Sequence, residues 1–344
     1  MVKCIKLHKE DAQKAINFLA SKKWLNKGYV LGKTQRYVLI ALTDDAKPQE
    51  ALKKFGASLE QRNLQKLPEK TGNIKHILKG VVPDKYFERL KNSFDMIGDI
   101  AVLEILPGME SFEHSIAWNL MRKNPNIKVI AKKASNVKGK FRTREIKVIL
   151  GEKRTTTIHT ESGIRMKVDV SKTYFSPRSG NERLRISSLV KENEKVLVMF
   201  AGVGPFALLI GKQHPDAEVI GVELNPLAVE YFNENIRANR LPNVKAILGD
   251  VKEFVKNTNE KYDRVIMPLP ENSWAFLDDA FKVSKKGTVI HFYTFCEEKK
   301  IKDIEKQINE IAKKENLKVK IQKVIQAGSH SPYVFRYCFD IQVQ

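Results

Sequence analysis

The stretch that decides the fold is Lys195–Gln213, KVLVMFAGVGPFALLIGKQ. It begins with a short apolar run rich in valine, which is typical of a buried strand. Gly202 and Gly204 follow at once, and a segment of helical composition begins at Pro205. A strand that turns through glycines into a helix is the opening unit of an alternating α/β sheet.

The same alternation continues to the end of the chain. The segments AEVIGVEL, VKAILGD, YDRVIM and GTVIHFYTF are predicted as strands, and the segments between them as helices. A long helix is expected over about 297–315. Two β-rich stretches follow, and their short connection makes them antiparallel. We therefore predict a doubly wound α/β fold for this part of the chain.

The residues before this unit have a different rhythm. Residues 1–66 contain a helical pattern, EDAQKAINFLASKKW, and a strand, RYVLIAL, which together indicate a small α+β domain. The segment LPEKTGN has the composition of a linker. Residues 74–170 are expected to form a second α+β domain, with strands in SFDMIGDIAVLEI and NIKVIAKKA and a hairpin in RTTTIHTESGIRMKVDV. The third domain is then 171–344.

The charge of the chain points to a polyanionic partner. Its 61 Lys and Arg residues against 40 Asp and Glu residues give a formal net charge of +21. Nucleic acid is the commonest such partner, although a lysine-rich composition also occurs in proteins from hot habitats. Eight basic residues lie within 128–147, a density that suits phosphate contacts or, alternatively, a solvated loop.

The three cysteines lie far apart and show no spacing typical of a metal site, so we expect each to be a small buried hydrophobic residue. We expect no metal. The sequence has neither an apolar run of membrane-spanning length nor a signal-peptide pattern at its start, which predicts a cytoplasmic protein. We also expect a monomer.

Three polar features follow successive strands of the α/β unit. Gly202 and Gly204 let the backbone approach a ligand closely. Glu223 ends the second strand, where a carboxylate can accept both hydroxyls of a ribose, and Asp250 ends the third, where it can accept from an adenine amino group. Each feature alone is ordinary, but together they predict a site for an adenosine.

Two adenosine-containing cofactors fit this pattern. The dinucleotide fingerprint is incomplete, because Ala207 stands at its last glycine position, although alanine is tolerated there. The acid that closes the third strand favours S-adenosyl-L-methionine. So does the corner Pro268-Leu269-Pro270 after the fourth strand, which resembles the proline corner of methyltransferases that act on bases and amines.

The chain also contains five longer motifs: TYFSPRSGNERLRI (173–186), MFAGVGPF (199–206), GVELNP (221–226), KGKFRTRE (138–145) and HFYTF (291–295). These motifs resemble those of the archaeal and eukaryotic tRNA (guanine-37-N1)-methyltransferase family. The resemblance covers the chain from about residue 70 to the end, and the first 66 residues more loosely. It implies a class I (Rossmann-like) S-adenosylmethionine-dependent methyltransferase domain, a middle RNA-contacting domain, and a small N-terminal domain that contacts the tRNA elbow.

The resemblance also implies the roles of single residues. N1 of neutral guanine carries a proton, so a base must remove it, and Glu182 matches the general base of the family. The alternative for Glu182 is a first-turn acid stabilised by the helix dipole. Arg142 and Arg178 match arginines near the target base in the anticodon loop. The cofactor site is assigned to Tyr174, Phe200, Gly202, Gly204, Glu223, Leu224, Asp250 and Val251.

Two positions depart from the family pattern. Guanine-specific members usually have asparagine where this chain has Pro268, whose side chain offers the base no hydrogen bond. The corner resembles relatives that methylate both N1 of guanosine and C7 of the wyosine precursor 4-demethylwyosine, so we expect both activities. Val198 replaces an acid, and this change is expected to weaken cofactor binding or alter the field of the site.

Other functions stay open at this point. The chain could be a monofunctional guanine-37-N1 methyltransferase, or an aminocarboxypropyl transferase of the wyosine pathway, which uses the same cofactor. The intact SPRSGNER motif with Glu182 argues against the aminocarboxypropyl transferase. An RNA-binding protein with a vestigial methyltransferase fold is supported only by Val198 and Pro268.

Overall fold

The computed structural model describes residues 1–26, 29, 31–34, 36–64, 78, 82, 86, 94–135, 139, 141 and 143–344. The chain divides into two compact units, Met1–Ile77 and Leu78–Gln344. The predicted linker 67–73 lies outside the described residues, and the limits 1–66, 74–170 and 171–344 stay a prediction. None of the helices in the described part is long and apolar enough to cross a membrane.

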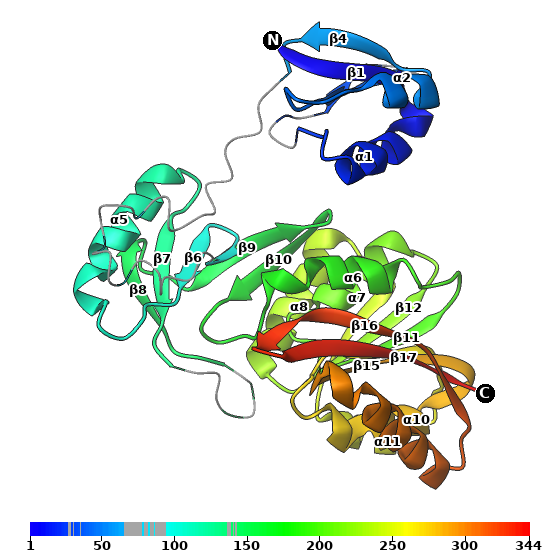
Figure 1. Ribbon diagram of the computed structural model, residues 1–344. Coiled ribbons are helices and arrows are strands. Elements are labelled where there is room, and N and C mark those ends of the chain that lie inside the picture. Colours follow the sequence, from blue (N-terminus) through cyan, green and yellow to red (C-terminus); the bar gives the residue numbers. More distant parts are fainter. Residues whose placement is uncertain are drawn as a thin grey trace. The chain divides into compact units, whose positions relative to one another are not determined.

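The first unit is a four-stranded antiparallel sheet with two helices (Figure 1). Its elements are β1 (Val2–His8), α1 (Ala12–Ser21), β2 (Gly32–Lys33), β3 (Tyr37–Ala41), α2 (Gln49–Phe55) and β4 (Ser58–Arg62), and the strand order is β2-β3-β1-β4. Ile5, Leu7, Leu19 and Ile40 are buried together in its core. The helix and the strand predicted here are confirmed.

A second four-stranded sheet lies at the start of the other unit. It contains β5 (Asp95–Ile97), β6 (Ile100–Leu103), β7 (Val129–Lys133) and β8 (Ile146–Gly151), with α5 (Glu113–Lys123) between β6 and β7. The stretch in which we expected one strand forms two, because the chain reverses at Gly98, whose φ of 56° is easily adopted only by glycine.

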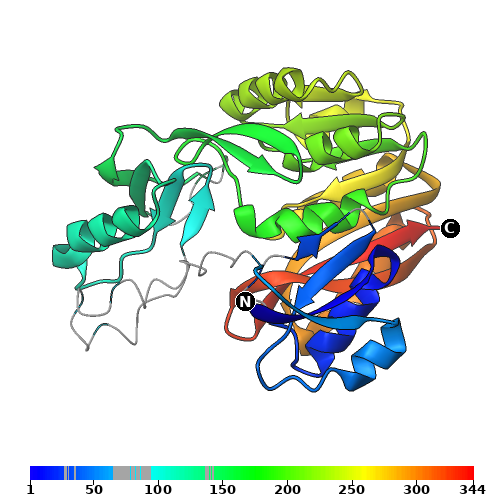
Figure 2. The same ribbon diagram turned by 90° about the horizontal axis from the view of Figure 1, so that it is seen from above.

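The predicted hairpin is confirmed as β9 (Thr156–Glu161) and β10 (Ile164–Asp169), with Ser162 and Gly163 at the turn in the left-handed region. In Figures 1 and 2 this hairpin extends between the four-stranded sheet and the large sheet of the same unit. Alternate side chains of β10 are buried, as the two-residue period of a strand requires.

The large sheet has seven strands in the order β13-β12-β11-β14-β15-β17-β16. The strands are β11 (Lys195–Met199), β12 (Glu218–Glu223), β13 (Val244–Leu248), β14 (Tyr262–Met267), β15 (Ser284–Glu297), β16 (Val319–Ser331) and β17 (Val334–Val343). β11 to β15 run parallel, whereas β17 is antiparallel to both of its neighbours. The predicted antiparallel closing pair is confirmed.

Helices cover both faces of this sheet (Figure 1). The core of one face contains side chains of α6 (Gly180–Ser187), α7 (Pro205–Gln213) and α8 (Pro226–Asn239). The core of the other contains those of α9 (Val251–Asn257), α10 (Leu277–Lys282) and α11 (Ile301–Lys314). Successive residues of β11 join opposite cores, Val198 the first and Met199 the second, because strand side chains alternate between faces. The predicted doubly wound α/β fold is confirmed.

Candidate active site

A cavity of about 260 Å³ lies at the carboxyl ends of the central strands. β11 lies between β12 and β14 in the sheet. The connections that follow β11 and β14 run to opposite faces of the sheet, and this divergence opens a crevice at the carboxyl ends of the strands. Most of the predicted cofactor residues line it, together with the proline corner. They are Tyr174, Phe200, Gly202, Glu223, Leu224, Asp250, Val251 and Pro268.

Glu223 lines this cavity, and two backbone N–H groups fix its carboxylate in place. Its Oε2 accepts from the N–H of Gly202 at 2.8 Å, and its Oε1 accepts from the N–H of Asn225 at 2.8 Å. Each carboxylate oxygen can accept a second hydrogen bond. The pair of oxygens is thus placed to accept both hydroxyls of a ribose, and Gly202, with a φ of 58°, provides the necessary turn.

Asp250 caps the helix that follows the third strand. Its Oδ1 accepts from the N–H of Lys252 at 2.8 Å, which leaves Oδ2 available to an amino group at the cavity. Phe200 and Phe276 line an aromatic wall with ring centroids 4.8 Å apart. Phe200 has a φ of 57°, a conformation that is uncommon for residues other than glycine and is often found at functional sites.

These groups fit S-adenosylmethionine. Acids at the ends of two neighbouring strands suit the ribose and the adenine amino group, and the aromatic wall suits the purine face. Gly204 does not line the cavity. A Cβ atom there would lie 2.2 Å from the ring of Phe232, so packing against α8 accounts for the glycine. Its predicted cofactor contact stays a prediction, as does the effect of Val198, which is 1% exposed in the core.

A second, smaller cavity of about 60 Å³ adjoins the first. Its lining includes Glu182, Tyr293 and Arg336. The two cavities share a wall formed by Tyr174, Phe200, Gly202 and Pro268. A group bound beside Glu182 therefore lies next to a ligand of the first cavity.

The carboxylate of Glu182 is 7% exposed and receives three hydrogen bonds. Arg185 donates to Oε2 from Nε at 2.9 Å and to Oε1 from Nη2 at 2.8 Å, and Tyr293 donates to Oε1 at 2.6 Å. Burial holds the pKa of Tyr293 well above its usual value, so the phenol remains a donor. Oε1 is fully used, whereas Oε2 keeps one lone pair.

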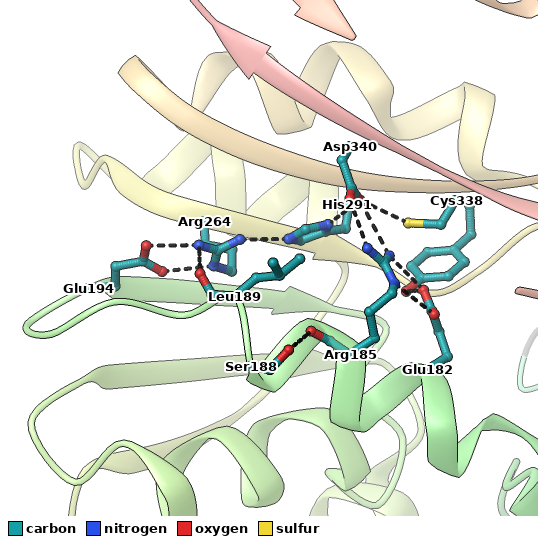
Figure 3. Close-up of polar contacts among 10 residues, drawn as sticks. Glu182, Arg185, Ser188, Leu189, Glu194, Arg264, His291, Cys338 and Asp340 are labelled. Atoms are coloured by element: carbon teal, nitrogen blue, oxygen red, sulfur yellow. Dashed lines mark hydrogen bonds and ion pairs between the residues drawn. The ribbon is translucent and has the colours of Figure 1, made fainter. Parts of the chain in front are cut away.

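Arg185 connects Glu182 to a chain of buried polar groups (Figure 3). Its Nη1 donates to Asp340 at 2.8 Å, and Asp340 accepts from Nδ1 of His291 at 2.6 Å. Nη1 of Arg264 lies 2.8 Å from Nε2 of His291 and donates to it. Arg264 also pairs with Glu194 at 2.7 Å. Opposite charges alternate along this chain, which offsets the cost of burying them.

Burial and hydrogen bonding together set the pKa values of His291 and Asp340. Burial lowers the pKa of His291, so the imidazole is neutral and can accept from Arg264. Burial acts to raise the pKa of Asp340, but hydrogen bonds from His291 and Arg185 outweigh it and hold that pKa below its ordinary range. Asp340 is therefore a carboxylate that fixes Arg185 in place behind Glu182.

His291, Cys338 and Asp340 bring three possible metal ligands within 4.8 Å of one another. Both imidazole nitrogens are already engaged, and the guanidinium groups of Arg185 and Arg264 lie against the same cluster. This environment does not suit a cation. Cys4, Cys296 and Cys338 are all buried free thiols, as predicted.

Arg178 does not line the cavity of Glu182. Arg178 donates to Asp95 at 2.7 Å, and its side chain is 63% exposed beside a neighbouring hollow. Arg142 lies outside the described residues. The roles of both arginines stay predictions.

Sequence reasoning missed the groups that support Glu182. Tyr293 and His291 belong to a strand that was recognised, and Asp340 to another. A polar residue at an inward position of an otherwise apolar strand was the available signal. Arg185 and Arg336 carried no signal that separated them from the many other basic residues of this chain.

Two family models match the chain. The TRM5/TYW2 methyltransferase domain matches residues 157–321, and the TYW2 N-terminal domain matches residues 74–155. A tRNA (guanine(37)-N(1))-methyltransferase, Trm5b of Pyrococcus abyssi, is 36% identical over 84% of this chain and 85% of its own length. The tRNA (guanine(37)-N(1))/4-demethylwyosine(37)-methyltransferase Taw22 of Nanoarchaeum equitans is 32% identical over 64% of this chain and 89% of its own length.

Solved structures agree with these matches. The crystal structure of wild-type Trm5b from Pyrococcus abyssi has a TM-score of 0.72 and 32% identity, and the alignment covers 100% of both chains. The complex of aTrm5 with tRNALeu has a TM-score of 0.70 and 30% identity over 99% of both chains. TYW2 of Methanocaldococcus jannaschii in complex with AdoMet has a TM-score of 0.57 and 27% identity, covering 73% of this chain and 99% of its own.

Proposed function

The chain belongs to the TRM5/TYW2 methyltransferase family, and from this premise we propose that it is an S-adenosylmethionine-dependent tRNA methyltransferase that modifies the purine at position 37. The observation that carries the proposal is the wall shared by the two cavities. It brings the carboxylate of Glu182 next to the site that fits the cofactor. A base that is to be both deprotonated and methylated needs this adjacency.

The chemistry of guanine assigns the role of Glu182. S-adenosylmethionine supplies an electrophilic methyl group when it is bound. N1 of guanine carries a proton and becomes nucleophilic as that proton leaves. The lone pair of Glu182 that receives no hydrogen bond is on Oε2, so we assign the proton to this atom. Arg185 and Tyr293 hold the carboxylate in one orientation while it acts.

A second activity is supported by the proline corner. Pro268 lines both cavities and offers the base edge no side-chain donor or acceptor. A pocket without that specific contact can accept guanosine and the tricyclic 4-demethylwyosine, and Taw22 carries the names of both reactions. We therefore extend the proposal to methylation of C7 of 4-demethylwyosine.

Binding of tRNA is supported by the charge of the chain and by a relative that was solved with tRNA. The net charge of +21 favours a phosphate-rich partner, and the relative aTrm5 was solved with tRNALeu. Arg178 and Arg142 remain our candidates for contacts near the anticodon loop. For the unit Met1–Ile77 we propose binding at the tRNA elbow, in line with the family resemblance.

The experiment measures the product at position 37. The protein is incubated with methyl-labelled cofactor and with tRNA that carries either guanosine or 4-demethylwyosine, and the nucleosides are identified by mass. One added carbon on each base is the expected result. No product on the tricyclic base would leave a monofunctional enzyme, and a four-carbon amino acid group would indicate the aminocarboxypropyl transferase activity named for other relatives.

A matched pair of variants tests the site itself. Glu182→Gln keeps the shape of the side chain and removes the proton acceptor, so methylation of guanosine should fall about 10²- to 10⁴-fold. Glu192→Gln, an exposed acid beyond the end of the same helix, should leave the rate unchanged. Equal rates for both variants would remove Glu182 from the mechanism.

A further inference from the structure

Two aromatic rings stack on each other where the large sheet ends. Phe295 belongs to β15 and His330 to β16, and their ring centroids lie 4.1 Å apart with 31° between the ring planes. Phe295 is half-buried and His330 is exposed. Among the described residues, neither ring belongs to the two hydrophobic cores of the sheet. Core packing therefore does not account for the pair, and its exposed side offers ring surface to a third flat group.

The register of the sheet places this pair beside the cavity that holds Glu182. Phe295 is directly opposite Arg336 on β17, and Tyr293 precedes it by two residues on the same side of β15. Tyr293 and Arg336 both line that cavity. Opposite side chains of a sheet lie about 5 Å apart, and side chains two positions apart in a strand about 7 Å. The ring pair is thus one side-chain spacing from the cavity.

The pair also stands beyond the point where the neighbouring parallel strand ends. Met267, the last residue of β14, is level with Phe292 of β15, whereas β15 continues to Glu297 and is paired there with β17. Phe295 therefore lies three positions past the end of β14. The overhanging ends of β15, β16 and β17 border the edge of the sheet at which both cavities lie.

The hairpin that carries His330 has a tyrosine where its turn favours glycine. Ser331 pairs with Val334, so the loop consists of Pro332 and Tyr333. Tyr333 has a φ of 63°, and a turn with proline first and a positive φ second normally takes glycine or asparagine there. Tyr333 is also 82% exposed. A strained residue that gains no packing energy indicates that its ring serves a contact outside the chain.

We propose that Phe295, His330 and Tyr333 form a stacking surface for the unpaired nucleobase next to position 37 of the tRNA; this inference rests on the proposed function. A base that enters the cavity of Glu182 leaves its own stack, so its neighbour in the loop loses a stacking partner. Aromatic side chains replace such partners in proteins that bind single-stranded RNA. Every base has a π face, so the stacking surface accepts any base at that position.

Two observations favour a nucleobase over a protein segment as the occupant. The stacking surface is continuous with the cavity proposed for the target base, and the chain has a net charge of +21. It consists of three rings around one hairpin, whereas a stable protein interface buries about 800 Å² on each partner. A single base is the size of group that three rings can cover.

The experiment compares three substitutions of His330 in the full chain. His330→Ala removes the ring, His330→Phe keeps a ring, and His330→Lys offers a cation without a ring. The dissociation constant of tRNA with guanosine at position 37 should rise about 5- to 30-fold in His330→Ala and His330→Lys, and less than about threefold in His330→Phe. His114→Ala, which removes an exposed histidine of α5, is the matched control and should bind as the wild type does.

A tRNA without the neighbouring base tests the contact itself. Two tRNAs carry an abasic residue at position 36 or at position 38. The wild type should bind one of them about 5- to 30-fold more weakly than the intact tRNA, whereas His330→Ala should bind that tRNA and the intact one equally. The single-turnover rate at saturating tRNA and cofactor should change less than about threefold in His330→Ala, because the stack is present before and during methyl transfer.

Tyr333→Gly separates binding from folding. Glycine adopts a positive φ without strain, so the midpoint of thermal unfolding should not fall. The dissociation constant of the tRNA should nevertheless rise about 5- to 30-fold, because a ring of the stacking surface is lost. An unchanged affinity in Tyr333→Gly would overturn the assignment of this residue.

Three outcomes would overturn the whole inference. Equal dissociation constants for the wild type and His330→Ala would leave the ring without a role in binding. Full affinity of His330→Lys, with a loss in His330→Phe, would make the position a phosphate contact. Equal penalties for the abasic residues in the wild type and His330→Ala would place the neighbouring base elsewhere. These failures differ from a failure of the proposed function, in which the wild-type protein itself forms no methylated nucleoside at position 37.

Discussion

The hydroxyl of Tyr293 on β15 donates a 2.6 Å hydrogen bond to Oε1 of Glu182 on α6, across 111 positions of sequence. The contact crosses from the sheet to a helix on one of its faces, and both side chains are buried. It fills the last acceptor position of Oε1 and thereby directs Oε2 toward the proton of the substrate. Orientation of the carboxylate is thus built into the core of the domain.

Tyr293→Phe tests this orientation. The change removes one hydrogen bond to a charged acceptor and should lower the free energy of unfolding by about 1–3 kcal/mol. Because the carboxylate loses its alignment, the single-turnover rate on guanosine tRNA should fall by about tenfold. Tyr262→Phe is the matched control, since Tyr262 is buried in the core on the other face of the sheet and makes no contact with Glu182 among the described hydrogen bonds. Urea titrations and rapid-quench assays that give the same values for both variants would contradict the assignment.

Glu223→Gln tests the cofactor site. An amide in place of the carboxylate points a donor at one of the two backbone N–H groups that Glu223 accepts from, and it offers the ribose one acceptor fewer. The dissociation constant of S-adenosylmethionine should rise by about 10- to 100-fold, or about 1.4–2.7 kcal/mol. Calorimetry measures it directly. Glu218→Gln, at the exposed start of the same strand, should bind the cofactor as the wild type does.

The contrast between Glu223 and Tyr293 shows how far the sequence alone leads. Glu223, Asp250 and the glycine turn were predictable, because each follows its own strand and parallel strands end at one edge of a sheet. The support of Glu182 was not. The pair His291–Asp340 exists only because β15 and β17 align these residues opposite each other, and the register of two distant strands is not encoded locally.

The same limit applies within the smaller sheet. The residues around Gly98 are apolar enough to be predicted as a single strand. The dipeptide Gly98-Asp99, which is typical of a turn, was the signal that the chain reverses there. Arg178 pairs with Asp95 beside a neighbouring hollow, a contact between residues 83 positions apart that no local pattern indicated. Its role near the target base stays a prediction.

The free energy of unfolding of the unit Leu78–Gln344 should depend on pH through Glu161. Burial acts to raise its pKa, but hydrogen bonds from His159 and Arg183 outweigh it and lower the pKa from 4.5 to about 2. The unfolded chain therefore binds the proton at higher pH than the folded one. The stabilisation is complete above about pH 4.5 and is lost as the pH falls toward 2, with about 3 kcal/mol at stake.

Glu161→Gln tests this linkage. The variant should lose the pH-dependent term and, because it leaves Arg183 buried without its carboxylate partner, should be about 3–5 kcal/mol less stable at pH 7. Urea unfolding between pH 2.5 and 7 gives both quantities. Glu152→Gln removes an exposed acid from a pair with Arg154 and is the control. A wild-type curve as flat as that of Glu161→Gln would be incompatible with the lowered pKa of Glu161.

Pro268→Asn tests the origin of the second activity. The substitution places an amide, which can both donate and accept, at a corner that lines the cofactor cavity and the cavity of Glu182. One added hydrogen bond to the guanine edge contributes about 1 kcal/mol, so the ratio of the rate on guanosine to that on 4-demethylwyosine should rise about five- to tenfold. The two rates are measured in one competition assay by nucleoside mass. Pro270→Asn, two residues further along and lining only the cofactor cavity, should leave the ratio as it is. A ratio that stays constant in Pro268→Asn as well would mean that the base edge is recognised elsewhere, and the proline corner would no longer account for dual specificity.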